Sequence, residues 1–135
     1  MREIKFRAWD ITNKKMILEP YLHFVNGHSF FLQQDKVRSD LEFTLMQYVG
    51  LKDKNEKDIF EGDIFTTKKT AYKIFCLGGA YGYAPIHTHT KELADAIKQA
   101  GHIPFFPFIT YPLKQSKLEI IGNIYENAEL LKNNL

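Results

Sequence analysis

YVGLKDKNEKDIFEGDIF, residues 48–65, is the stretch of this chain that decides its fold. Apolar residues typical of strands alternate there with turn residues: Lys52–Asp58 predicts a turn, and Ile59–Phe60 begins the returning strand. Gly62 suits a bulge or tight bend that redirects the chain before Ile64–Phe65. The stretch contains no obvious catalytic group, so it predicts architecture rather than chemistry.

Short strands also fill the chain before this stretch. Glu3–Trp9 alternates with a period of two, which predicts a strand with one buried face, and Met16–Leu18 returns as its partner after turn residues at Asp10–Lys14. One face of this strand carries Ile4, Phe6 and Ala8, and the other carries Lys5, Arg7 and Trp9.

A hairpin and a longer strand follow. Asn26-Gly27 predicts a tight hairpin turn, because both residues accept positive backbone angles. Gln33–Asp40 is polar and predicts a loop. The alternation of Leu41, Phe43 and Leu45 then predicts a strand that continues through Val49.

After residue 65, Ala71–Leu77 predicts a strand that follows an exposed turn at Lys68-Lys69, and the glycine- and tyrosine-rich Gly78–Pro85 predicts a loop. Lys91–Ala100 predicts a helix, because apolar residues recur at helical spacing along it. These residues are Leu93, Ala94, Ile97 and Ala100, with Thr90 as a cap at the start and Gly101 at the end.

The C-terminal part is predicted to hold an extended segment and a final strand. Ile103–Leu113 (IPFFPFITYPL) carries no charge, and its prolines favour an edge strand or extended segment. Leu118–Tyr125 predicts a strand, and Ala128–Lys132 a short terminal helix that begins after Asn127. Together these patterns predict a mainly β domain, either a small barrel or packed sheets, with one or two short helices.

Composition excludes several classes of protein. The 135 residues are 44% hydrophobic and 25% charged, with a formal net charge of +2, which alone does not indicate nucleic acid. The one cysteine, Cys76, cannot form an internal disulfide, and its strand position predicts a buried side chain. The charged N-terminus lacks a signal-peptide pattern, and no window resembles a membrane span, so we expect an intracellular protein.

Three pieces of the chain together resemble the YopX family, small proteins encoded by bacteriophages and prophages. The pieces are MREIKFRAWD with NKKM following, YVGLKDKNEKDIFEGDIF, and IIGNIYENAELL. Two positions depart from the family pattern. Glu56 replaces the glycine of an Asn-Gly turn, so a wider loop is expected there. Ala128 replaces a proline that often follows Asn127, and alanine is still compatible with a helix start.

The resemblance implies a mostly β fold with an SH3-like barrel portion, and it implies expression in the cytoplasm of a bacterial host. We therefore expect one YopX-like domain over residues 1–135, with N-terminal hairpins in 1–47 and a barrel in 48–135 that carries an inserted helix at about 91–100. The resemblance carries no activity, and it transfers no catalytic or ligand-binding residue. Thr66–Ser116 matches none of the three pieces.

Metal binding and nucleophilic catalysis have weak candidates in the sequence. His87 and His89 would share one face of a strand and could reach one ion. Further ligands are present by residue type only, namely His102, Cys76, Asp95 and Glu92, and a polar approach to the helix explains the histidines as well. Cys76 could pair with a histidine as a nucleophile, but no nucleophile signature surrounds it. We therefore predict no metal, no cofactor and no catalytic residue.

Four further groups of residues could carry a function, but each also has a structural interpretation that we favour. The carboxylates Asp58, Glu61 and Asp63 are expected to accept hydrogen bonds in turns. Gly78, Gly79 and Gly82 match no phosphate-binding fingerprint. Tyr81 and Tyr83 could stack on a base or planar ligand, and Lys5, Arg7 and Trp9 could form a nucleic-acid platform.

The leading hypothesis from the sequence is a non-enzymatic, homo-oligomeric phage accessory protein that binds a host or phage macromolecule. The uncharged Ile103–Leu113 segment is the candidate surface for self-association. The alternatives are a counter-defence protein that sequesters a small ligand or nucleotide, and a nucleic-acid-binding barrel.

Overall fold

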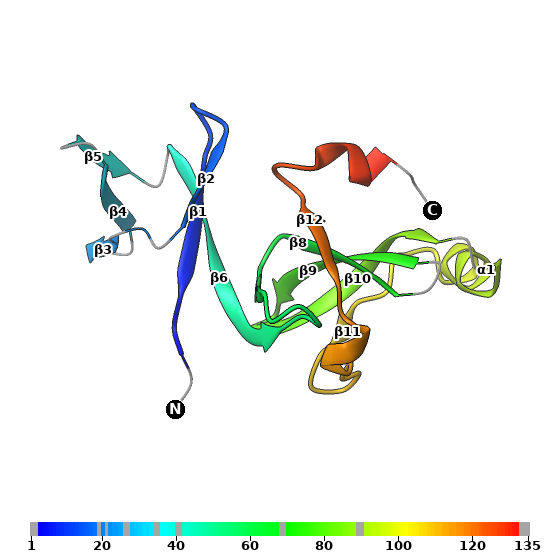
Figure 1. Cartoon of the computed structure of the whole chain (residues 1–135). Helices are drawn as coiled ribbons and strands as arrows, with labels where there is room; N and C mark the ends of the chain where they lie inside the picture. Colours follow the sequence, from blue (N-terminus) through cyan, green and yellow to red (C-terminus); the bar gives the residue numbers. More distant parts are fainter. Residues whose placement is uncertain are drawn as a thin grey trace. The chain divides into compact units, whose positions relative to one another are not determined.

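The computed structural model describes residues 3–18, 20, 22–25, 28–33, 36–39, 42–67, 70–88 and 91–132, and it confirms a mainly β fold (Figure 1). Between residues 21 and 41, and at 87, 88 and 132, only the backbone is described. The chain folds into two structural units, an N-terminal unit, Met1–Tyr48, and a C-terminal unit, Val49–Leu135.

The N-terminal unit is built from antiparallel strands. Strand β1 (Phe6–Asp10) pairs with β2 (Lys15–Leu18) and with β6 (Phe43–Lys52), whose last residues continue into the C-terminal unit. The core between these strands is small: Ala8 and Phe43 are buried, and Ile17 and Leu45 pack against them.

A separate three-stranded sheet, in the order β3-β4-β5, consists of β3 (Leu22–Val25), β4 (His28–Gln33) and β5 (Lys36–Ser39). Val25 pairs with His28, as the predicted hairpin requires, while Asn26-Gly27 lies outside the described residues. The predicted loop at Gln33–Asp40 is wrong, because β5 pairs with β4. The polar composition of this segment led to the loop prediction, but the backbone hydrogen bonds of a strand do not depend on apolar side chains.

The predicted faces of the first strand need correction. Ile4 precedes β1 and is 68% exposed, whereas Arg7, expected on the open face, is only 6% exposed. Arg7 and Ala8 are both buried although neighbouring residues of a strand point to opposite faces, so both faces of β1 are covered at this point. The prediction from the period of two assumed that only one face of the strand is covered, and it is therefore wrong for β1.

A carboxylate organises the turn after β1. Asp10 is fully buried, and its Oδ1 accepts hydrogen bonds from the backbone N–H groups of Thr12 and Asn13, each at 3.1 Å. Its Oδ2 accepts a third bond from the side-chain amide of Asn13 at 2.9 Å. The turn predicted at Asp10–Lys14 is confirmed, and a short acceptor side chain holds it.

The C-terminal unit contains a curved five-stranded antiparallel sheet in the order β11-β10-β9-β8-β12 (Figure 1). Its strands are β8 (Asp63–Thr67), β9 (Thr70–Leu77), β10 (Ala80–Thr88), β11 (Phe106–Pro107) and β12 (Ile120–Asn123). The predicted edge position of the proline-rich segment is confirmed, because β11 pairs with β10 at one end of the sheet. The other elements of the unit are β7 (Asp58–Phe60), α1 (Lys91–Ala100), η1 (Gln115–Lys117) and η2 (Ala128–Lys132).

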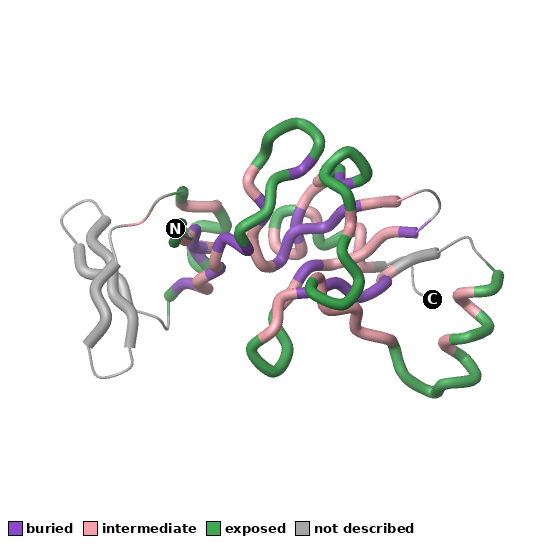
Figure 2. Tube along the Cα trace, turned by 90° about the horizontal axis from the view of Figure 1, so that it is seen from below, coloured by how far each residue is buried: buried purple, intermediate pink, exposed green. Residues whose placement is uncertain are grey.

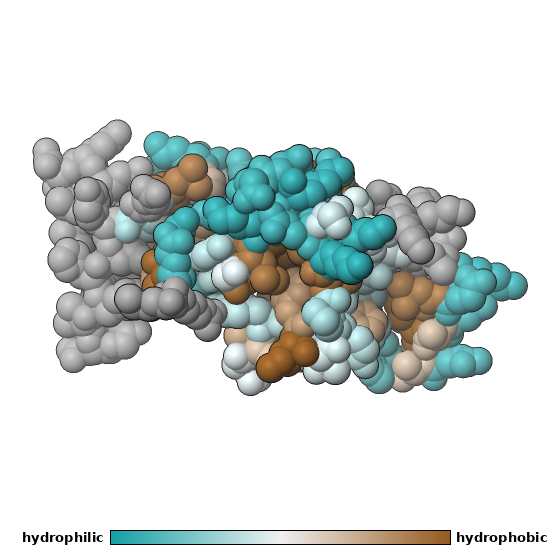
Figure 3. Space-filling view, turned by 60° about the horizontal axis from the view of Figure 1, so that its bottom comes forward, coloured by the Kyte–Doolittle hydropathy of each residue, from teal (hydrophilic) through white to brown (hydrophobic). Residues whose placement is uncertain are grey.

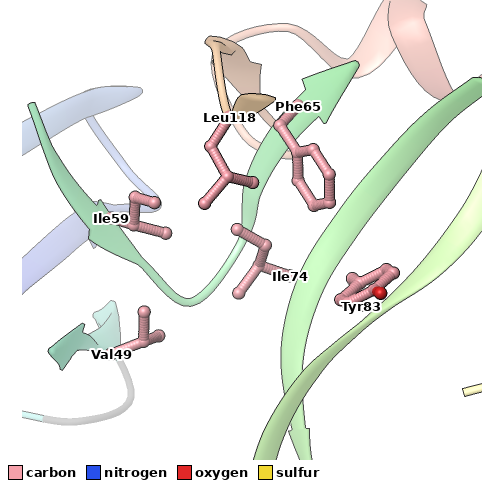
Figure 4. Packing of buried hydrophobic residues seen from close by; sticks show 6 residues of the cluster. All are labelled: Val49, Ile59, Phe65, Ile74, Tyr83 and Leu118. Atoms are coloured by element: carbon pink, nitrogen blue, oxygen red, sulfur yellow. The ribbon is translucent and has the colours of Figure 1, made fainter. Parts of the chain in front are cut away.

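Six buried side chains form the core of the C-terminal unit, and Figure 4 shows them converging from different segments of the chain. They are Val49, Ile59, Phe65, Ile74, Tyr83 and Leu118. Aromatic rings extend this core: Tyr83 lies 5.5 Å from Phe65 and 5.4 Å from Phe106 between ring centroids. Such pairs contribute about 0.5–1.5 kcal/mol each beyond their buried area.

The predicted loop at Gly78–Pro85 is wrong, because β9 and β10 form a tight hairpin there. Leu77 pairs with Ala80, so Gly78 and Gly79 alone make the turn, and both have positive φ angles of 60° and 83°. Two adjacent positive φ angles are the signature of a type I′ hairpin turn, which glycine adopts without strain. The residues after this turn, predicted as a loop, instead form strand β10.

Helix α1 has the predicted bounds, Lys91–Ala100, and Gly101 follows it with a φ of 74°. No residue of α1 is fully buried, and Figure 2 shows the helix only in the colours of intermediate and exposed residues. The predicted terminal helix is a 3-10 helix, η2, and the final strand is shorter than predicted. Among the described residues, no helix is long and apolar enough to span a membrane.

Candidate functional site

The turn between β6 and β7 is held by a buried carboxylate. Asp53 Oδ1 accepts hydrogen bonds from the backbone N–H groups of Asn55 and Lys57, both at 2.9 Å. Its Oδ2 accepts one from the N–H of Ile120, 67 residues away, at 3.1 Å. The loop spans five residues, 53–57, and Glu56 adopts a φ of 64°. The wider loop expected at this departure from the family pattern is thus present.

Opposing effects act on the pKa of Asp53. Burial raises the pKa, but the hydrogen bonds from Ile120, Lys57 and Asn55 and the charge of Lys57 outweigh burial. The net result is a pKa below its ordinary value of 3.8, because these bonds favour the ionised form.

Asp53 and neighbouring residues connect two of the three pieces that carry the family resemblance. Besides the Asp53–Ile120 bond, the N–H of Ile124 donates to the carbonyl of Gly62 at 2.8 Å, and Asn123 pairs with Asp63. The central stretch and the C-terminal motif are therefore one structural assembly, although more than 50 residues separate them in sequence.

The C-terminal motif contains its own side-chain-nucleated turn. Asn123 Oδ1 accepts hydrogen bonds from the N–H groups of Tyr125 and Glu126, at 3.0 and 2.7 Å. Asn127 Oδ1 accepts the N–H of Asn123 at 3.0 Å. A Cβ on Gly122 would overlap the Asn127 side chain, so glycine is needed where these elements approach closely.

A cleft of about 630 Å³ lies beside this assembly, within the C-terminal unit. We call it the Lys54–Lys117 cleft. Its lining residues come from the β6–β7 loop, the end of β8, and the segment around η1: Lys54, Thr66, Thr67, Leu113, Ser116, Lys117 and Glu119. The Nζ atom of Lys54 forms an ion pair with Glu119 Oε2 at 2.9 Å.

A second, smaller hollow of about 240 Å³ runs along α1, and we call it the α1 groove. Its lining is almost entirely apolar: Leu93, Ala96, Ile97, Ala100, His102, Pro104 and Phe106. In Figure 3, hydrophobic surface gathers beside the hydrophilic outer face of this helix. The apolar side of α1 that predicted the helix is therefore only partly covered.

The 103–113 segment presents further apolar surface. Ile109 is 91% exposed, Ile103 56% and Tyr111 50%. The same segment contributes Phe106, Phe108 and Leu113 to the edge of the core. The segment thus has two roles, because one side completes the core while the other leaves large apolar side chains in water.

The histidine hypothesis for a metal site gains no support. His87 belongs to β10, where only its backbone is described, and His89 lies outside the described residues. His102 is exposed, and its Nδ1 lies 3.1 Å from the carbonyl of Ala100. Among the described residues, no group of three or more histidine, cysteine or acidic side chains could hold a metal ion.

The predictions for Cys76 and for the tyrosines need correction. Cys76 is exposed, because the end of β9 extends past the core toward the Gly78-Gly79 turn. Tyr83 is buried in the core, and its hydroxyl donates to the Tyr111 carbonyl at 3.0 Å, so it offers no stacking surface. Tyr81 is half-buried and packs against the same core. Burial, and then the nearby Tyr72 and Tyr111 phenols, raise the pKa of Tyr83.

The carboxylate group and the basic platform also have structural explanations. Asp63 is buried and its Oδ2 accepts the N–H of Phe60 at 2.8 Å, as expected for a turn acceptor. Asp58 forms an ion pair with Lys52 at 3.2 Å. Arg7 is buried and is therefore not available to the predicted nucleic-acid platform. The Nζ atom of Lys5 lies 5.2 Å from the centroid of the Tyr48 ring and forms an ion pair with Glu3 Oε1 at 3.4 Å.

The sequence patterns do not identify the residues of the Lys54–Lys117 cleft. Lys54 belongs to a predicted turn, and Thr66, Ser116 and Lys117 lie between the predicted elements. No local motif marks them, because the cleft arises only when the segment around η1 meets the β6–β7 loop and the end of β8, which lie more than 40 residues earlier in the sequence. A surface specific to this chain is expected in Thr66–Ser116, outside the family pieces, and this signal covers Thr66, Thr67, Leu113 and Ser116 but not Lys54, Lys117 or Glu119.

Comparisons with known proteins agree with this architecture. The family model described as "YopX protein" matches residues 5–132. The crystal structure of protein EF1440 from Enterococcus faecalis is similar, with a TM-score of 0.62 and 24% sequence identity over 98% of this chain and 100% of that chain. At this identity the likeness concerns the fold alone. The chain matches none of the curated proteins.

Proposed function

Because the chain belongs to the YopX family, whose model matches residues 5–132, we propose that it is a phage or prophage accessory protein acting in the cytoplasm of a bacterial host. In this proposal it is a non-enzymatic, homo-oligomeric binding module for a host or phage macromolecule. The curved sheet of the C-terminal unit serves as the SH3-like portion of the fold. The observation that carries the proposal is the exposed apolar surface of the 103–113 segment.

The physical argument rests on Ile103, Ile109 and Tyr111. Burying one such side chain against a partner stabilises a complex by about 1.5–3 kcal/mol relative to exposure. The 103–113 segment carries no charge that a partner would have to desolvate. It also includes the edge strand β11, whose outer side has no neighbour in the strand order of the described residues. A second copy of this chain is therefore its proposed occupant.

Mass measurement on purified protein tests the oligomer. Light scattering or native mass spectrometry should give a multiple of the 15.8 kDa chain. Ile109→Asp should reduce the mass to that of a single chain, because it places a charge in the contact. Ile121→Asp is the matched control, since Ile121 is also exposed but lies on β12, at the other end of the sheet order.

Two outcomes would overturn the oligomer proposal. One is a wild-type protein that stays a single chain at all accessible concentrations. The other is an Ile109→Asp protein that keeps the wild-type mass. Loss of the oligomer in Ile121→Asp alone would place the contact on β12 instead of the 103–113 segment.

The macromolecular partner can be sought by affinity capture from infected host cells. Wild-type protein and Ile109→Asp should be used as parallel baits. A macromolecule retained by both baits would bind independently of self-association. If neither bait retains any macromolecule above an empty-resin control, the binding-module proposal fails.

A further inference from the structure

The Lys54–Lys117 cleft has the size and lining of a small-ligand site. Its volume of about 630 Å³ falls within the range of about 300–1,000 Å³ that is typical of ligand pockets. Its lining includes two lysines, Lys54 and Lys117, and three residues that carry a hydroxyl group, while Leu113 contributes an apolar side chain. The hydroxyls belong to Thr66, Thr67 and Ser116.

This combination favours a phosphate group over other ligands. A lysine ammonium attracts phosphate as a point charge, and hydroxyl groups donate to phosphate oxygens. Glu119 also faces the cleft and pairs with Lys54, but an ammonium has three donors and can contact a second anion while this ion pair persists. Leu113 offers contact to the carbon-containing part of the same ligand.

The walls of the cleft are fixed by hydrogen bonds that do not involve any ligand. The N–H of Lys54 donates to the carbonyl of Leu118 at 2.8 Å, and that of Lys117 donates to the carbonyl of Lys114 at 2.9 Å. Gln115 Nε2 donates to the carbonyl of Asp53 at 2.8 Å and thereby joins η1 to the β6–β7 loop. The backbone of both lysines is therefore ordered before binding, which lowers the entropic cost of capturing a ligand.

We propose that the Lys54–Lys117 cleft binds a small organic phosphate, with Lys54 and Lys117 holding the phosphate and Leu113 contacting the organic group. Except for Leu113, the described lining residues lie outside the 103–113 segment, and none of them is the exposed Ile103, Ile109 or Tyr111, so ligand binding and self-association can be measured separately. A small ligand is favoured over a nucleic acid chain because glutamate shares the cleft and the formal net charge of the protein is only +2.

Nuclear magnetic resonance titration of the full isotope-labelled chain tests the site. Adenosine 5′-monophosphate is the probe, with inorganic phosphate and adenosine as partial probes. The monophosphate should shift the amide signals of Thr66, Thr67, Ser116 and Lys117, and it should bind more tightly than inorganic phosphate. Adenosine alone should leave these signals unchanged at the same concentration.

Charge reversal at the cleft supplies the matched comparison. Lys117→Glu should weaken adenosine monophosphate binding by about tenfold or more, the loss expected when one charged contact is removed. Lys91→Glu makes the same change on exposed α1 and should leave binding unaltered. Both lysines are exposed, so dispersed spectra of the two variants provide the check on folding.

The proposal is wrong if neither the monophosphate nor inorganic phosphate shifts the cleft signals, or if Lys117→Glu and Lys91→Glu weaken binding equally. Equal shifts from adenosine and its monophosphate would also contradict it, because the phosphate would then contribute nothing. If single-stranded DNA shifts the amide signals of the cleft while adenosine monophosphate and inorganic phosphate do not, the ligand is a nucleic acid and not a small organic phosphate.

Discussion

The pieces that carry the family resemblance and the intervening Thr66–Ser116 segment use their side chains for different purposes. In the three family pieces, short acceptor side chains are buried and hold turns by accepting backbone N–H groups: Asp10, Asp53, Asp63 and Asn123. Thr66–Ser116 instead supplies aromatic side chains to the core and exposes apolar side chains such as Ile109. The family pattern therefore records how the chain turns, and surfaces available for binding lie mainly in the other segment.

Asp53→Ala should produce the largest effect, because it removes the acceptor that joins two family pieces. Three backbone N–H groups lose a charged acceptor, and we expect a loss of about 3 kcal/mol or more in the free energy of unfolding. Chemical denaturation measures this loss. Glu56→Ala removes an exposed carboxylate from the same loop and should cost less than about 0.5 kcal/mol.

A similar loss in both variants would mean that any charge in this loop matters equally. That result would contradict the claim that buried acceptors such as Asp53 stabilise the fold more than exposed side chains do.

Gly82→Ala tests whether one position of the unmatched segment is as constrained as the family pieces. A Cβ there would lie 2.5 Å from the carbonyl oxygen of Phe106 and 2.6 Å from Cζ of Phe105. The alanine should push β11 away from β10 and destabilise the protein by about 1–3 kcal/mol, as overpacking does. Chemical denaturation of Gly82→Ala, Phe105→Ala and the double variant measures how much of the destabilisation comes from the contact with the Phe105 ring. No loss in Gly82→Ala would show that β11 adjusts freely.

Tyr83→Phe isolates one polar contact of the aromatic core. The variant keeps the ring but loses the hydrogen bond to the Tyr111 carbonyl, which should cost about 0.5–1.5 kcal/mol. Tyr72→Phe is the control, because its half-buried ring stacks on Phe65 at 5.2 Å and only the hydroxyl is removed. Thermal unfolding of both variants provides the measurement. If Tyr83→Phe unfolds at the same temperature as the wild type, the hydrogen bond to the Tyr111 carbonyl does not help to hold the 103–113 segment.

Glu56→Gly should change the free energy of unfolding least, and the change should be stabilising. Glu56 has a φ of 64°, a conformation that costs an ordinary residue about 1–2 kcal/mol. Glycine removes this strain but loses more entropy on folding and cannot accept the bond from Gln115 Nε2, so we expect a net gain of about 0.5 kcal/mol. Denaturation of Glu56→Gly beside Glu56→Ala separates relief of strain from loss of the side chain. Equal stability of the two variants would contradict a strained backbone.

Several features of the fold could be predicted from local patterns. The strands around residues 48–65, the bend at Gly62, the helix Lys91–Ala100 and the edge position of the proline-rich segment each follow from neighbouring residues. Such features depend on propensity, periodicity and turn chemistry, which are visible in a short window.

The errors arose where distant contacts determine the outcome. The composition of Gly78–Pro85 is typical of a loop, but Tyr83 packs in the core and Gly82 gives Phe105 and Phe106 space to approach. The exposure of Cys76 depends on where the core ends beneath β9. The Lys54–Lys117 cleft is likewise assembled from three separated segments, so no local pattern could reveal it.

The most direct test of the scaffold role of the family pieces is the pH dependence of stability in the wild type and in Asp53→Asn. The pKa of Asp53 is lowered on folding, so the stability it contributes is complete above its unfolded pKa of about 3.8 and is lost as the pH falls through the folded pKa. Asparagine lacks the charge and the second acceptor oxygen that receives the N–H of Ile120.

Chemical denaturation of both proteins should therefore give a wild type that is more stable at neutral pH, with the gap closing as the solution is acidified through this range. A constant gap at every pH, or no gap at neutral pH, would contradict the claim that ionised Asp53 ties the central stretch to the C-terminal motif.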